Sequence, residues 1–136
     1  MSGYLLDANI LSDFVRHRHG RVARHLAALR DRGEKDIAIS IIAAGQLRFG
    51  IEKRSSQRLT RRVEQVLAAI DVLPLTAPAD AIYGRLRADL ERRGQPMGAS
   101  DLWIAAHALA TGHILVTDDR GFDRIAELEC ENWLAA

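Results

Sequence analysis

Short apolar segments alternate with longer amphipathic ones along the whole chain, and this alternation limits the folds that the chain can adopt. We expect strands at residues 4–6, 37–39, 72–75 and 114–116, and a weaker one at 128–132. Between them, apolar residues recur at helical spacing, most clearly from residue 56 to residue 70. Strands separated by helices of this length are typical of βαβ crossovers in a parallel sheet covered on both faces. The sequence therefore predicts an α/β fold.

Small polar residues and glycines mark the expected helix boundaries. Ser40, Thr76 and Ser100 each stand beside the start of a helical segment and are expected to cap it. Gly112 is expected to end the helix that follows Ser100, and Gly50 to mark a bend in the helix that follows Ser40. The strand at 72–75 contains Pro74, so it either lies at an edge of the sheet or ends at this residue.

The length and the cysteine count narrow the class of protein. The chain has 136 residues, enough for one hydrophobic core, so residues 1–136 are expected to form a single domain. No apolar run reaches the roughly 18 residues that cross a bilayer, so we expect no membrane association. Cys130 is the one cysteine, which excludes an intrachain disulfide and favours a cytoplasmic protein.

Basic residues are concentrated in one part of the chain, although the formal net charge is only +1. Residues 16–62 contain 11 Arg and 2 Lys against 4 acidic residues. Such a stretch is typical of a surface that faces a polyanion, and arginine suits planar contacts with phosphate. An arginine-rich genome with solvated helix faces explains the same composition equally well.

Carboxylates stand where strands end and helices begin. Asp7 directly follows the first strand, and Asp101 lies in the first turn of a helix. Asp118 and Asp119 follow the strand at 114–116 after one residue. Ligands of parallel sheets collect outside the carboxyl ends of the strands, and an oxygen-only set favours Mg²⁺ or Mn²⁺. Taken singly, each acid is better explained as a helix cap or a turn residue. Taken together, they favour a metal site.

At these residues the chain resembles the PIN-domain nucleases, in particular the VapC toxins of bacterial toxin–antitoxin pairs. A lone Asp-x-Asn, here Asp7-Ala8-Asn9, is a weak signal, whereas ordered blocks at the right spacing across one small domain are a specific one. The blocks cover essentially the whole chain: Leu5–Ser12, Ile39–Ser40, Leu47–Lys53, Gly98–Ala108, Leu115–Phe122 and Glu131–Trp133.

The resemblance implies both a fold and a chemistry. The fold is an α/β/α sandwich with a central, mainly parallel sheet of four to five strands. The activity is that of a toxin in a type II toxin–antitoxin system, a Mg²⁺- or Mn²⁺-dependent endoribonuclease in which a metal-activated water attacks the phosphodiester.

The resemblance also implies roles for individual side chains. Asp7 and Asp101 would be metal ligands, and Asp119 would be the fourth acidic position, with Asp118 as its alternative. Asn9 and Thr117 would support the site through hydrogen bonds.

One position departs from the family pattern. On the helix after the second strand, just before Leu47, the family has its second acidic residue and this chain has Gln46. Glutamine has the shape of glutamate but no charge, so it cannot act as a base and binds divalent cations weakly. Gln46 is either an introduced change that silences a toxic nuclease, the interpretation we favour, or a natural feature of a weakened or inactive member. The catalytic set would then be Asp7, Gln46, Asp101 and Asp119.

The basic stretch supplies candidate RNA contacts. Aromatic residues make up only 5% of the chain, so base stacking is not expected to carry specificity, and a structured RNA such as tRNA is the expected substrate. The arginines expected to contact it are Arg16, Arg18, Arg21, Arg24 and Arg48.

Partners follow from the same resemblance. It implies a VapB-type antitoxin whose C-terminal segment places a basic residue in the acidic site and whose N-terminal domain binds operator DNA. It also implies a homodimer. An alternative function is a catalytically inactive toxin homologue that acts as antitoxin partner and co-regulator of its operon. The antitoxin groove could use Ile10, Leu11, Phe14 and Phe49, although these residues fit a core equally well.

Overall fold

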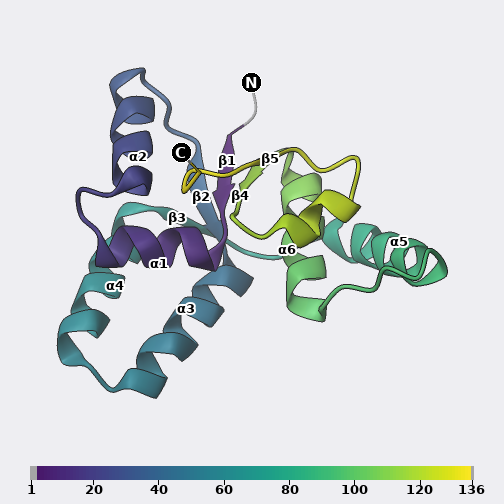
Figure 1. Ribbon diagram of the computed structural model, residues 1–136, viewed down its shortest axis with the longest axis horizontal. Coiled ribbons are helices and arrows are strands. Elements are labelled where there is room, and N and C mark those ends of the chain that lie inside the picture. The colour runs from purple at the N-terminus through teal and green to yellow at the C-terminus, as the bar shows by residue number, and fades with distance from the viewer. Residues whose placement is uncertain (1–2, 136) are drawn as a thin grey trace.

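A computed structural model of the protein describes residues 3–135 (Figure 1). Within this range all neighbouring strands pair in parallel, in the order β3-β2-β1-β4-β5. The expected α/β fold with a parallel sheet of four to five strands is therefore confirmed. The strands are β1 (Tyr4–Leu6), β2 (Ile37–Ser40), β3 (Asp71–Leu73), β4 (Ile114–Val116) and β5 (Cys130–Glu131).

Helices cover both faces of this sheet, because successive side chains of each strand point to opposite faces. Leu5 and Leu115 pack into an apolar cluster with residues of α3 to α6, whereas Leu6 and Val116 pack with residues of α2 and with Trp133. These two clusters give the α/β/α arrangement expected for the fold. The helices are α1 (Ala8–Arg16), α2 (Arg21–Asp31), α3 (Ile41–Arg54), α4 (Gln57–Ala69), α5 (Ala79–Arg92) and α6 (Ala99–Thr111), and a 3-10 helix, η1, spans Arg120–Arg124.

Two of the expected helix caps are correct in detail. Ser40 precedes α3, and its Oγ accepts a hydrogen bond from the backbone N–H of Ile42 at 3.1 Å. Gly112 ends α6 in the left-handed conformation, at a φ of 70°. The helix α3 runs through Gly50 without a break, so this glycine does not interrupt the helix.

The other two caps are wrong. Thr76 does not cap α5, which begins at Ala79, because the Thr76 carbonyl instead accepts from the Ala79 N–H at 3.0 Å in a turn that precedes the helix. Ser100 lies inside the first turn of α6, because Gly98 is already extended and takes the cap position itself.

Strand limits also differ slightly from expectation. The strand β3 lies at the sheet edge and ends at Leu73, directly before Pro74, so the proline both marks the edge and terminates pairing. The last strand is shorter than predicted, at Cys130–Glu131. Among the described residues, no helix has the length and apolar character needed to cross a membrane.

Candidate active site

The carboxyl ends of the neighbouring strands β1 and β4 bring Asp7 and Thr117 together. Leu6 is in register with Val116, so the residues that follow them meet at the same edge of the sheet. Thr117 Oγ1 donates a hydrogen bond to Asp7 Oδ2 at 2.9 Å, and Asp7 Oδ1 accepts from the Ala8 N–H at 2.8 Å. Asp7 is 5% exposed. It therefore does cap α1, as the simpler interpretation held, while both of its oxygens are held at the strand end.

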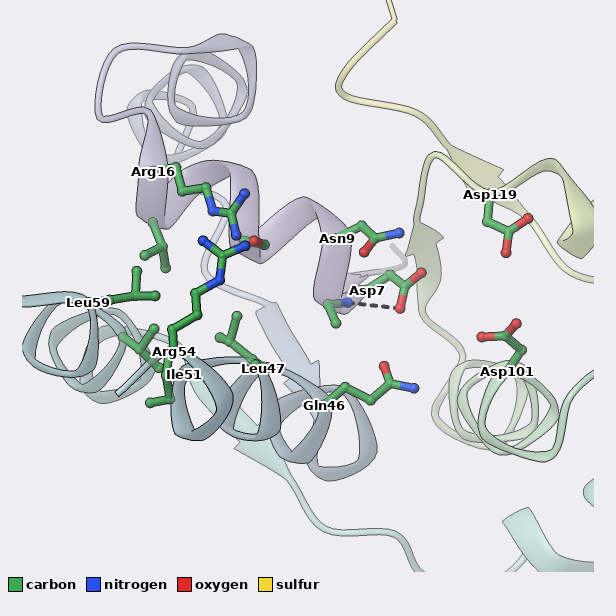
Figure 2. Close-up of a pocket in the computed structure, with 15 residues that line it drawn as sticks. Asp7, Asn9, Arg16, Gln46, Leu47, Ile51, Arg54, Leu59, Asp101 and Asp119 are labelled. Carbon is green, nitrogen blue, oxygen red and sulfur yellow. Dashed lines mark hydrogen bonds between the residues drawn. The ribbon is translucent and has the colours of Figure 1, made fainter. Parts of the chain in front are cut away.

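A pocket of about 350 Å³ lies at this edge and gathers side chains from segments that are far apart in the sequence. Asp101 enters from the first turn of α6, Gln46 from α3, and Asp119 from the turn after β4, opposite Asp7. Figure 2 shows these four side chains directed toward a common space. The four residues expected to form the catalytic set thus lie together, although they are distant in the sequence.

The carboxylates of this pocket perturb one another. Burial raises the pKa of the Asp7 carboxyl above its ordinary value, the charges of Asp118 and Asp119 raise it further, and the hydrogen bonds to Asp7 oppose the rise. Burial likewise raises the pKa of Asp101, with the charges of Asp7 and Asp119 as additional causes. At neutral pH the charged pocket is therefore unfavourable by itself, and a cation would relieve it.

The donor set of the pocket fits a hard divalent cation. Its candidate ligands are the carboxylate oxygens of Asp7, Asp101 and Asp119, with no sulfur or imidazole among the residues that line it. No three His, Cys, Asp or Glu side chains within residues 3–135 are close enough to form a ready cage for an ion. Repulsion between the carboxylates opposes a closer approach, and it adds to the rise in pKa that burial causes at Asp7 and Asp101.

The side chains of Asp118 and Asp119 are adjacent in the sequence but differ in their relation to the pocket. Asp119 Oδ1 accepts from the Gly121 N–H at 2.8 Å and caps η1, which turns its side chain to the pocket. Asp118 is exposed and lines a separate hollow, and its contact with the site is an Asn9 Nδ2 hydrogen bond of 3.5 Å. Asn9 itself lines the pocket. Of the two adjacent acids, Asp119 rather than Asp118 faces the other carboxylates.

The arginines expected to bind RNA are spread over several surfaces. Arg16 lines the pocket, and Arg18 lines a neighbouring groove. Arg21 and Arg24 line a different hollow on α2, and Arg48 is paired with Glu64. The structure therefore brings only Arg16 of these five to the pocket itself.

Sequence reasoning missed part of the pocket wall. Arg54, at the end of α3, lines the pocket beside Arg16 (Figure 2), and Leu47, Ile51 and Leu59 form an apolar side. The helical spacing of Gln46, Gly50 and Arg54 along α3 is the signal that could have indicated Arg54.

Two of the residues expected in an antitoxin groove are too buried to contact a partner. Ile10 and Leu11 are fully buried in the core, whereas Phe49 is 65% exposed on α3.

Sequence comparison relates this geometry to known proteins. The family described as PIN domain matches residues 4–128. The chain is 32% identical over 132 residues to ribonuclease VapC2 of Rickettsia felis, covering 96% of this chain and 97% of that protein. The chain belongs to the VapC group of PIN-domain proteins. A second VapC, the tRNA(fMet)-specific endonuclease of Shigella flexneri, is 33% identical over 138 residues, covering 98% and 99% of the two chains.

Solved VapC structures agree with the fold. VapBC2 from Rickettsia felis, bound to a DNA fragment from its promoter, matches with a TM-score of 0.88 at 31% identity, over 96% of this chain and 98% of that one. DNA-bound VapBC from Salmonella typhimurium matches with a TM-score of 0.84 at 29% identity, over 98% and 99%. The VapC relatives are named as ribonucleases or endonucleases, which places the chain among nucleases.

Proposed function

We propose that this VapC-type protein is a metal-dependent endoribonuclease toxin that cleaves structured RNA, with tRNA as its substrate class. The observation that carries the proposal is the meeting of Asp7, Asp101 and Asp119 with Gln46 in one pocket. The Shigella flexneri relative, named for tRNA(fMet), supports the choice of tRNA.

Asp7, Asp101 and Asp119 would hold the ion, Mg²⁺ or Mn²⁺, which when bound supplies an activated water and offsets the charge of the phosphodiester. The chain's own contribution is to orient these oxygens. Thr117 donates to one oxygen of Asp7 and the Ala8 N–H to the other, so each oxygen keeps one further lone pair for a ligand. Hydrogen bonds of this kind fix the direction of a metal ligand.

Gln46 limits what the pocket can do. Its amide can donate and accept hydrogen bonds, so it can orient a water molecule, but it cannot take a proton from it. We therefore expect the activity of this chain to be low, and to rise when a carboxylate stands at position 46.

A direct test compares the chain with Gln46→Glu on an unmodified initiator tRNA transcript, with Mg²⁺ or Mn²⁺ and with excess EDTA. Gln46→Glu is expected to cleave on the order of 100-fold faster, because a general base is worth about this much. EDTA is expected to stop the reaction. Full cleavage in excess chelator would reject the metal mechanism, and no gain from Gln46→Glu would reject the silencing role of Gln46.

A second function is favoured specifically by Gln46: an inactive homologue that binds its antitoxin and co-regulates the operon. In both functions we infer a VapB-type antitoxin that places a cationic side chain among the pocket carboxylates and binds operator DNA, and we infer a homodimer. The DNA-bound VapBC complexes of relatives support these partners. Growth after induction without antitoxin separates the two functions. If neither this chain nor Gln46→Glu arrests growth, the antitoxin-binding function is favoured.

A further inference from the structure

A groove of about 670 Å³ lies next to the pocket, between the end of α1 and the α3–α4 hairpin. We name it the arginine groove. None of the described residues that line it is acidic. Its cationic side chains are Arg16, Arg18, Arg54, Arg58, Arg61 and Arg62.

One of these arginines is fixed by its neighbours. Arg62 Nε donates to the Val15 carbonyl at 3.4 Å, and its guanidinium lies 5.5 Å from the centroid of the Phe14 ring. This contact ties α4 to the end of α1 and forms the back of the groove. Arg58 and Arg61, by contrast, are exposed on the outer part of α4, so they are free to meet a ligand.

Several arginines elsewhere in the described part of the chain are paired with carboxylates, although others, such as Arg24 and Arg30 on α2, are not. Arg85 pairs with Glu127 at 2.8 Å and Arg93 with Asp89 at 3.0 Å, and Arg48 pairs with Glu64. In the part of the chain that the structure describes, none of the six groove arginines has such a carboxylate partner. Six clustered like charges repel one another, so the groove is built for a ligand that carries several negative charges.

The arginine groove is continuous with the pocket. Arg16 and Arg54 line both, and Figure 2 shows them at the end of the pocket opposite Asp101 and Asp119. Gln46 and Arg54 are eight residues apart on α3, which corresponds to about 12 Å along the helix axis. An RNA strand with one phosphodiester at the carboxylates would therefore place its neighbouring phosphates over the arginines.

We propose that the arginine groove binds the phosphates of the RNA strand that flank the bond cleaved in the pocket. The proposal rests on the proposed function and deepens it by assigning the surface that holds the substrate. An RNA strand is favoured over an acidic peptide because the groove is continuous with the carboxylate pocket, which the phosphodiester to be cleaved must reach. Arginine forks fit phosphate oxygens in two-point contacts.

The test measures binding of the initiator tRNA transcript in EDTA, which separates binding from cleavage. Arg58→Gln with Arg61→Gln is expected to weaken binding on the order of tenfold at 0.1 M salt, and to reduce the slope of log K against log salt by about 1.4, or 0.7 for each lost single-strand phosphate contact. The matched control, Arg30→Gln with Arg32→Gln at the end of α2, removes the same charge from exposed side chains and is expected to leave both unchanged. Arg58→Lys with Arg61→Lys keeps the charge and is expected to retain the slope.

Three results would overturn the proposal: unchanged binding by the groove variant, equal weakening by the α2 control, or a larger loss for a polyglutamate peptide than for RNA. Unfolding temperatures check that the variants are folded. In the Gln46→Glu background the groove variant is expected to raise KM and leave kcat within about twofold. If Gln46→Glu cleaves the transcript and adding the groove substitutions leaves KM unchanged, the role of the groove is rejected while the nuclease function stands. If Gln46→Glu does not cleave the transcript but the groove substitutions abolish RNA binding, the nuclease function is rejected and RNA binding by the groove stands.

Discussion

The carboxylate pocket and the arginine groove are adjacent, yet they are built in opposite ways. Asp7 is buried, accepts two hydrogen bonds and sits at the end of a central strand. Arg58 and Arg61 are exposed and lie in the first two turns of one helix, α4. The pocket concentrates negative charge from three separate segments, whereas the groove concentrates positive charge mainly from one hairpin and the end of α1.

This difference suits the pocket to a chemical step and the groove to binding. Reacting groups must be held in fixed positions, so they sit on rigid elements with supporting hydrogen bonds. Contacts to phosphate tolerate movement, because a flexible cation gains most of its attraction without a fixed geometry. We therefore expect pocket substitutions to change the rate of cleavage or metal affinity, and groove substitutions to change RNA affinity and its salt dependence.

The largest expected effect is that of Asp7→Asn, which should abolish cleavage in both the Gln46 and the Gln46→Glu backgrounds. Asparagine caps a helix about as well as aspartate, so α1 should remain intact while a ligand charge is lost. Rates on the tRNA transcript measure the effect, with Asp80→Asn on α5 as a control that removes one exposed carboxylate. Residual cleavage above a tenth of the parent rate would contradict the role of Asp7.

A smaller effect is expected for Thr117→Val, which keeps the shape but removes the donor to Asp7 Oδ2. The pKa of Asp7 should rise further, since that hydrogen bond opposes the rise. Affinity for Mn²⁺ should fall by about 10- to 100-fold, more at low pH than at high pH. Calorimetric titration at several pH values measures it. Thr117→Ser keeps the hydroxyl and should behave as the parent, and equal affinities for all three proteins would refute the supporting role.

Stability without metal offers a third test. The pKa of Asp101 is raised in the folded protein, so its ionisation costs stability as pH rises above the ordinary value of 3.8. Asp101→Asn removes this cost and should raise Tm in EDTA at pH 7 by a few degrees. The difference should disappear as pH falls below about 4, where the carboxyl is protonated in both states. A lower Tm for the variant at pH 7 would show that Asp101 is not strained by its neighbours.

The smallest expected effect is that of Arg16→Ala, at the border of the two regions. It should weaken RNA binding only a few-fold and in a salt-dependent manner, because one phosphate contact of several is lost. Binding isotherms at two salt concentrations measure this. A loss of kcat without a change in affinity would place Arg16 with the pocket rather than with the groove.

The sequence predicted the pocket better than the groove, for a physical reason. Asp7 follows β1 directly and Asp119 follows β4 after two residues, so knowing which strands are parallel already places them at one edge. Gln46 was placed by resemblance, because the helix that carries it follows the second strand.

The groove depends on tertiary packing that no local pattern shows. The arginine-rich stretch predicted a basic surface, but Arg21 and Arg24 face another hollow and Arg48 is paired with Glu64. The choice between Asp118 and Asp119 likewise depends on the turn that Asp119 forms with Gly121. The starts of α5 and α6 were mistaken because turns before a helix can use backbone carbonyls or an extended glycine in place of a capping hydroxyl.

The helix α3 carries Gln46 in its second turn and Arg54 at its last residue, with no break between them. In the proposed function, this unbroken helix would set the distance between the bond that is cleaved and the arginine groove. Inserting a single residue between these positions would rotate Arg54 by about 100° around the axis and advance it by about 1.5 Å. In the proposed function, exchanging side chains along α3 would keep this distance, whereas a one-residue insertion would turn Arg54 away from the groove.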